Sequence, residues 1–145
     1  MKQIIHNIFF IFYISALILI TNETVNSEII MIVNKNVRMD TIEPSSIANI
    51  YFGNKTKWPD GQTIHVVMLK KGKTHDLFVN KILRSTPSKL KSYWKKVVFT
   101  GIGIRPRIFR NEADVVKYIS TTKGTIGYID DSVSHDIVKV IKIKQ

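Results

Sequence analysis

The stretch PSSIANIYFGNKTKWPDGQTIHVVML, residues 44–69, carries the signals of a helix, a turn and a strand in succession. Pro44 suits the first turn of a helix, and Gly53 suits a position just beyond its end. The apolar side chains on one face of this helix are Ile47, Ile50 and Tyr51. The turn residues PDG at 59–61 then lead into IHVVML at 64–69, whose β-branched side chains favour a strand.

Working outward, the other elements alternate in the same way. Residues 29–33, IIMIV, form a continuous apolar run that is typical of a strand covered on both faces. The remaining predicted elements are a helix over 74–83 capped by Thr74, a helix beginning at Pro87, a helix capped by Asn111 and ended by Gly124, and strands over 125–129 and 138–143. Alternation of strands and helices predicts an α/β fold with three layers, in which helices flank a mostly parallel sheet.

The helix that begins at Pro87 is strongly amphipathic. Its predicted inner face consists of Leu90, Tyr93, Trp94, Val97 and Val98. Lysines at 89, 91, 95 and 96 fill the outer face, which we interpret as a solvated surface.

The first 27 residues have the pattern of an export signal. Lys2 precedes a nearly unbroken apolar run over residues 8–20, which is shorter than the roughly 20 residues that span a bilayer. We therefore predict a signal peptide over 1–27, cleaved after Ser27, and a folded domain over 28–145 that lies in the periplasm or otherwise outside the cytoplasm. The alternative is an uncleaved anchor, which would also place the domain outside the cytoplasm.

Composition limits the kind of protein further. A length of 145 residues allows one domain at most, and 22 Lys and Arg against 11 Asp and Glu give a net charge of +11. The absence of cysteine excludes a disulfide framework, a thiolate metal site and a cysteine nucleophile. Neither an aromatic-interleaved RNA motif nor a helix-turn-helix accompanies the positive charge, so we expect no nucleic-acid partner.

The basic strand-to-helix junction after residue 69 is the main candidate site. Its residues are Lys70, Lys71, Gly72, Lys73 and Thr74, and backbone N–H groups with three ammonium groups there could hold an anion. A P-loop is rejected because Val67 stands where the loop needs a glycine. The alternative, to which we give equal weight, is that residues 70–74 form a solvated turn that binds no anion. Arg105 and Arg107 could add to an oxyanion site.

No pattern of an enzyme or a metal site is found. The histidines at 65, 75 and 135 lack ligand spacing, and no GxSxG elbow is present. We expect no catalytic residue, no metal and no cofactor.

One segment resembles a known family. Residues 47–64, IANIYFGNKTKWPDGQTI, look like the "I..IF.GK...WPDG..I" stretch of the phosphate-binding proteins of ABC transporters, in the type 2 periplasmic binding protein superfamily. Later landmarks follow in the same order, and the similarity extends over residues 29–143. These landmarks are Phe78, Tyr93, Trp94, Gly101, Gly103 and the run from Ile126 to Tyr128.

The resemblance implies a single lobe of a protein that usually has two. Full-length members carry an RxDGSGT-type loop before the helix that binds phosphate, and residues 68–74 match that loop. Thr74 and the helix start are retained, whereas Met68 stands at the arginine position and lysines replace the neutral residues.

Two functional hypotheses follow. In the first, the chain is an exported, non-catalytic binding protein for phosphate or another oxyanion, similar to the binding component of an ABC transporter. In the second, the ligand site of the lobe has degenerated and its basic face docks an acidic partner, the envelope surface or a second copy of the chain.

Overall fold

The computed structural model describes residues 27–101 and 103–144, so all of the predicted signal peptide over 1–27 except Ser27 lies outside this range. The elements in chain order are β1 (Ile29–Val33), β2 (Thr41–Ile42), α2 (Pro44–Tyr51), β3 (His65–Leu69), α3 (Lys73–Leu77), the π-helix η1 (Phe78–Ile82), α4 (Pro87–Thr100), β4 (Arg107–Phe109), α5 (Glu112–Thr121), β5 (Thr125–Asp130) and β6 (Lys139–Ile143). Within the described part of the chain, no helix combines the length and the apolar character needed to cross a membrane.

The sheet has six strands in the order β2-β6-β1-β5-β3-β4. β3 runs parallel to both β4 and β5, and β2 runs parallel to β6. β1 is antiparallel to both of its neighbours, β5 and β6. The predicted α/β fold is confirmed, and the sheet is mixed because its central strand β1 is reversed. An apolar run predicts that a strand is buried on both faces, but it carries no information on the direction of its partners.

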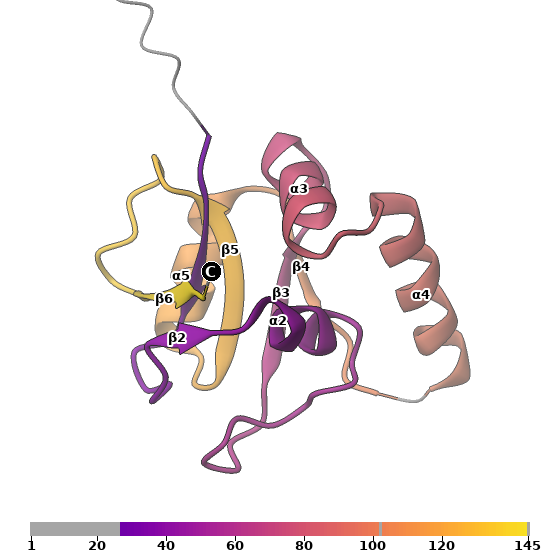
Figure 1. Cartoon of the computed structure of the whole chain (residues 1–145), viewed down its shortest axis with the longest axis horizontal. Helices are drawn as coiled ribbons and strands as arrows, with labels where there is room; N and C mark the ends of the chain where they lie inside the picture. The colour runs from indigo at the N-terminus through magenta and orange to yellow at the C-terminus, as the bar shows by residue number, and fades with distance from the viewer. Residues whose placement is uncertain (1–26, 102, 145) are drawn as a thin grey trace, which may run out of the picture.

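Successive residues of β5 define the three layers. Gly127 faces α5, and a Cβ at this position would lie 2.7 Å from Ile119 Cδ1, so the absent side chain lets α5 pack close to the sheet. Tyr128 points to the other face, where its ring stacks on Phe78 of η1 with 3.7 Å between centroids. Figure 1 shows α5 on one side of the sheet and α2, α3 and α4 on the other.

Helix α2 forms as its sequence predicts. Pro44 stands at its start, Phe52 is the C-cap, and Gly53 adopts a left-handed φ of 68°. Its three predicted inward residues, Ile47, Ile50 and Tyr51, are fully buried. The hydroxyl of Tyr51 donates to the carbonyl of Val67 at 3.2 Å, which fixes α2 against β3.

The predicted helix over 74–83 differs from the structure. The α-helix begins at Lys73 and continues after Leu77 as the π-helix η1. Gly72, with φ 121°, occupies the N-cap position, and the predicted cap Thr74 directs its hydroxyl to Glu112 at 2.6 Å. Because Gly72 holds the N-cap position, Thr74 lies inside the first turn of the helix, and its hydroxyl bonds to a tertiary partner instead of capping the helix.

Helix α4 lies at the side of the molecule, beyond α3 and η1 (Figure 1). Thr86 caps its start by accepting from Lys89 N–H, and Gly101 ends it in a left-handed conformation. Leu90 and Trp94 are buried, and Trp94 Nε1–H donates to Tyr51 O at 3.0 Å. Val98, predicted to face inward, is 40% exposed, because the last turns of α4 stand away from the sheet.

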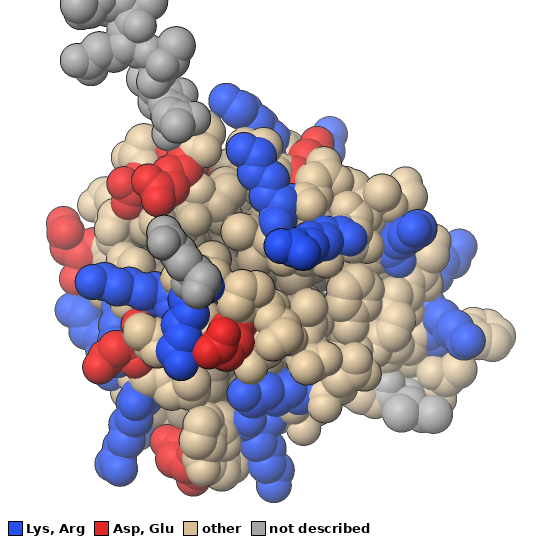
Figure 2. Space-filling view, viewed as in Figure 1, with Lys and Arg blue, Asp and Glu red and all other residues tan. Residues whose placement is uncertain are grey.

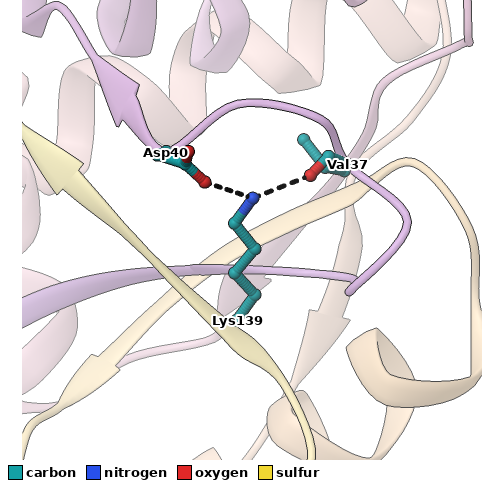
Figure 3. Close-up of polar contacts among 3 residues, drawn as sticks. All are labelled: Val37, Asp40 and Lys139. Carbon is teal, nitrogen blue, oxygen red and sulfur yellow. Dashed lines mark hydrogen bonds and ion pairs between the residues drawn. The ribbon is translucent and has the colours of Figure 1, made fainter.

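Lys139 of β6 stabilises the edge of the sheet formed by β2 and β6. Its ammonium group contacts Asp40 Oδ1 at 2.7 Å and the carbonyl of Val37 at 3.0 Å (Figure 3). The hydrogen bond and charge of Lys139 lower the pKa of the Asp40 carboxyl. These contacts hold the segment before β2 against β6. Among the residues that the structure describes, the buried apolar core extends from Met31 to Ile141 and so lies within residues 28–145.

Gly124 and Gly61 form a matched pair for testing the packing between β5 and the segment before β3. Both have positive φ, but a Cβ on Gly124 would lie 2.3 Å from the Thr63 carbonyl oxygen, whereas Gly61 has open space. Gly124 also accepts from Trp58 Nε1–H at 3.0 Å and from His65 N–H at 3.1 Å.

We expect Gly124→Ala to lower the free energy of unfolding by about 2–5 kcal/mol, from about 1–2 for the left-handed backbone and about 1–3 for the clash. Gly61→Ala should cost only about 1–2 kcal/mol, since no clash adds to the backbone term. Urea unfolding of both variants measures the difference. Equal losses would contradict the close contact between Gly124 and Thr63.

Candidate functional site

The basic junction lies where β3 ends, at the edge of the sheet that holds the carboxyl ends of the parallel strands β3, β4 and β5. Lys70 continues the pairing for one residue, because its N–H donates to Phe109 O at 2.8 Å. Lys70, Lys71, Gly72 and Lys73 are all exposed. Ligands of open α/β sheets commonly bind outside the carboxyl ends of the strands.

The buried side chain of Tyr128 makes hydrogen bonds on both sides of this junction. Its hydroxyl oxygen accepts from Leu69 N–H at 3.1 Å and lies 2.6 Å from His75 Nδ1. Because the oxygen already accepts from Leu69, its single hydrogen can point to Nδ1, which requires a neutral imidazole. Burial lowers the pKa of His75, against a smaller opposing effect of Asp76, and burial raises the pKa of the Tyr128 phenol. Both groups are therefore uncharged near neutral pH.

Glu112, in the first turn of α5, connects the same edge from the other side. Its carboxylate accepts from the Thr74 hydroxyl at 2.6 Å and from Asp130 N–H at 2.7 Å. The pKa of Asp130 is lowered by hydrogen bonds from Ser132 and Ser27, with a smaller contribution from the charge of Lys73. Thr74 and Lys73 thus face the carboxylates of α5 and β5.

A cavity of about 530 Å³ opens between α4 and the strands β3 and β4. The predicted site residues in its lining are Lys70, Lys71 and Arg105. Gly72, Lys73, Thr74 and Arg107 do not line it. The structure therefore divides the predicted anion loop, with Lys70 and Lys71 on the cavity side and Lys73 and Thr74 on the α5 side.

The two predicted arginines are also separated. Arg107 pairs with Val67 in the β3–β4 ladder, and its guanidinium lies 6.0 Å from the Phe109 ring centre and 5.8 Å from that of Tyr118 in α5. This is cation–π geometry on the α5 face of the sheet. Arg105 precedes β4 by two residues, so it lies toward the start of the strand pair, whereas Lys70 and Lys71 follow its end.

Positive charge is concentrated on the part of the chain that contains α4. Residues 77–111 contain no Asp or Glu, and their basic residues are Lys81, Arg84, Lys89, Lys91, Lys95, Lys96, Arg105, Arg107 and Arg110. In the described residues both ion pairs lie at β6, Lys139–Asp40 and Lys144–Glu43, so none of these nine cations is paired with a carboxylate. Figure 2 shows acidic side chains intermixed with basic ones on the side of β1, β2 and β6, whereas the α4 side of this view shows basic side chains without acidic ones.

Two members of the site escaped prediction from sequence. A glutamate in the first turn of a helix, as at Glu112, is common because it complements the helix dipole, and a histidine in a first turn, as at His75, is often exposed, so neither position signals a site. The pattern HDLF after Thr74 gives no signal that His75 is buried against a tyrosine 53 residues away. Among the residues that the structure describes, no group of three or more His, Asp or Glu side chains is placed to hold a metal ion.

Comparison with known proteins identifies the fold. No protein-family model matches the chain, and no curated protein matches it significantly in sequence. A Clostridium perfringens protein described as a phosphate ABC transporter substrate-binding protein, solved with bound phosphate, superposes with a TM-score of 0.64 and 21% identity, over 81% of this chain and 45% of that chain. PstS from Borrelia burgdorferi superposes with a TM-score of 0.65 and 12% identity, over 82% of this chain and 48% of that chain. A Vibrio cholerae ABC-type phosphate transport receptor superposes with a TM-score of 0.56 and 13% identity, over 81% of this chain and 46% of that chain.

The chain thus spans about half the length of each of these structures. At these identities the likeness concerns the fold. The chain has the architecture of about half of a phosphate ABC transporter substrate-binding protein, which confirms the predicted single-lobe resemblance.

The contact between His75 and Tyr128 predicts a dependence of stability on pH. Because the folded pKa of His75 is lowered, the unfolded chain binds a proton there that the folded chain does not, once the pH falls below about 6.5. The stability contributed by neutral His75 is therefore present above this pH and is lost as the pH falls toward the folded pKa. Urea unfolding of the wild type and of His75→Gln between pH 7.5 and 5 should show a steeper loss for the wild type. Parallel curves would contradict this assignment.

Proposed function

We propose that this chain is an exported, non-catalytic binding protein for an oxyanion, with phosphate as the first candidate ligand. The observation that carries the proposal is a pair of exposed lysines, Lys70 and Lys71, at the carboxyl end of β3, in a fold that makes up half of phosphate-binding proteins. Cations at this edge of a parallel strand are well placed to meet an anion.

The two lysines are favoured over the rest of the predicted loop because of their surroundings. Lys70 and Lys71 line the cavity, whose described lining contains one carboxylate, Asp76. Lys73 is close enough to Asp130 to lower its pKa, and the hydroxyl of Thr74 is donated to Glu112. An incoming anion would compete with Glu112 for Thr74, but not for Lys70 or Lys71.

The affinity should therefore come mainly from charge. Exposed ammonium groups attract an anion through interactions that salt screens, with a Debye length of about 8 Å at physiological ionic strength.

Export, and a place beside a transporter, are proposed from the apolar run over residues 8–20 and from the fold.

The test is a calorimetric titration of residues 28–145 with phosphate, sulfate, nitrate and chloride at constant ionic strength, with thermal unfolding in parallel. We expect saturable binding of phosphate and a rise in melting temperature of several degrees, since a ligand at about 100 times its Kd adds about 2.7 kcal/mol of stability. Equal small shifts with all four anions would contradict the proposal and would favour an acidic protein partner.

A matched pair of variants locates the site. Lys70→Ala with Lys71→Ala should weaken phosphate binding at least tenfold, because both cations of the proposed site are removed. Lys117→Ala with Lys123→Ala removes the same charge from exposed positions in and after α5 and should change the affinity less than twofold. Similar losses in the two double variants would show a general effect of net charge.

A further inference from the structure

We infer that the cavity beneath α4 is a binding site for an elongated amphiphilic anion, a hydrocarbon chain that ends in one phosphate or carboxylate group. The position of the charged group at Lys70 and Lys71 rests on the proposed function. The hydrocarbon part of the site rests on separate observations, which are the apolar walls of the cavity and their exposure.

The walls of the cavity are mostly apolar. They include Met68, Leu69, Leu90, Trp94, Val98 and Ile108. Val98 is 40% exposed and Ile108 is 56% exposed, so the wall leaves apolar surface in contact with water. The volume of about 530 Å³ lies within the range of about 300–1,000 Å³ that is usual for small-molecule sites.

Cations surround this apolar surface. Lys70 and Lys71 stand at the end of β3, Lys91 and Lys95 lie along α4, and Arg105 lies before β4. The described lining includes the single carboxylate Asp76. An apolar trough with a cationic margin complements a ligand that has an apolar body and a negative charge. A small hydrated anion would use the margin but would leave the apolar walls wet.

The cavity is long enough for a chain to lie in it. Its lining follows α4 from Pro87 to Val98, which corresponds to about 16 Å at 1.5 Å per residue. Pro87 begins α4 five residues after η1 ends, and α3 and η1 follow the junction that bears Lys70, whereas Val98 lies on the last turn of α4, seven residues before Arg105. We therefore place the charged group at the β3 end and the tail of the chain between Val98 and Ile108.

The ligands for the test are inorganic phosphate and octyl, decyl and dodecyl phosphate, each below its micelle concentration, with dodecanol as the uncharged control. Trp94 lines the cavity, so the tryptophan fluorescence of residues 28–145 reports binding, and calorimetry checks it. Affinity should rise about twofold to fourfold for each added methylene, and dodecyl phosphate should bind at least tenfold more tightly than inorganic phosphate and dodecanol.

Two matched pairs of variants test the assignment of the walls and the margin. Val98→Asp should weaken dodecyl phosphate at least tenfold, whereas Phe99→Asp, at the next position, should not, because Phe99 is 92% exposed and lies outside the cavity lining. Lys91→Gln with Lys95→Gln should weaken binding more than Lys89→Gln with Lys96→Gln, since only the first two lysines line the cavity.

The outcomes separate this inference from the proposed function. If inorganic and dodecyl phosphate bind equally and Val98→Asp has no effect, the inference fails and the oxyanion site stands. If dodecyl phosphate binds with the expected chain-length slope but Lys70→Ala with Lys71→Ala changes the affinity for neither dodecyl phosphate nor inorganic phosphate, the proposed function fails and the apolar site stands. If neither inorganic phosphate nor dodecyl phosphate binds, both the proposed function and this inference are overturned. Binding to anionic vesicles without any binding of monomeric dodecyl phosphate would overturn the inference in favour of a membrane surface.

Discussion

The hydroxyl of Tyr128 connects three parts of the fold, and the position of the basic junction depends on it. The side chain is 1% exposed, so its oxygen must be satisfied inside the protein, and it meets Leu69 at the end of β3 and His75 in α3. Lys70 and Lys71 lie on the short connection between these two contacts. Both ends of the connection that carries the two lysines are therefore held by a buried phenol on β5.

Much of the fold could be predicted because individual residues specify it locally. Pro44 and Asn111 mark helix starts that the structure confirms, and the apolar runs after residues 28 and 63 are strands. The reversal of β1 and the three-residue strand β4 could not be predicted in this way. Strand direction and short edge strands are decided by partners far away in the chain, and the residues from 107 to 109 carry no signal of their own.

The candidate site shows the same limit at a smaller scale. Its residue types were predicted as one five-residue group, and the structure divides the group between two sides of the strand end. Thr74 donates to Glu112 of α5, 38 positions later in the chain, and the charge of Lys73 contributes to the lowered pKa of Asp130 at the end of β5. Composition and spacing could indicate a basic junction, but only tertiary packing could show that Glu112 engages its threonine.

The separation of charge described above also gives the molecule a permanent electric dipole. The positive end is formed by α4 and its flanking segments, which carry no acidic residue, whereas acidic and basic groups are intermixed around β1, β2 and β6 (Figure 2). A dipole of this kind turns the protein as it approaches any negatively charged body, and the torque acts over distances set by the ionic strength. An approach to a negatively charged surface with α4 leading is therefore favoured over the opposite orientation.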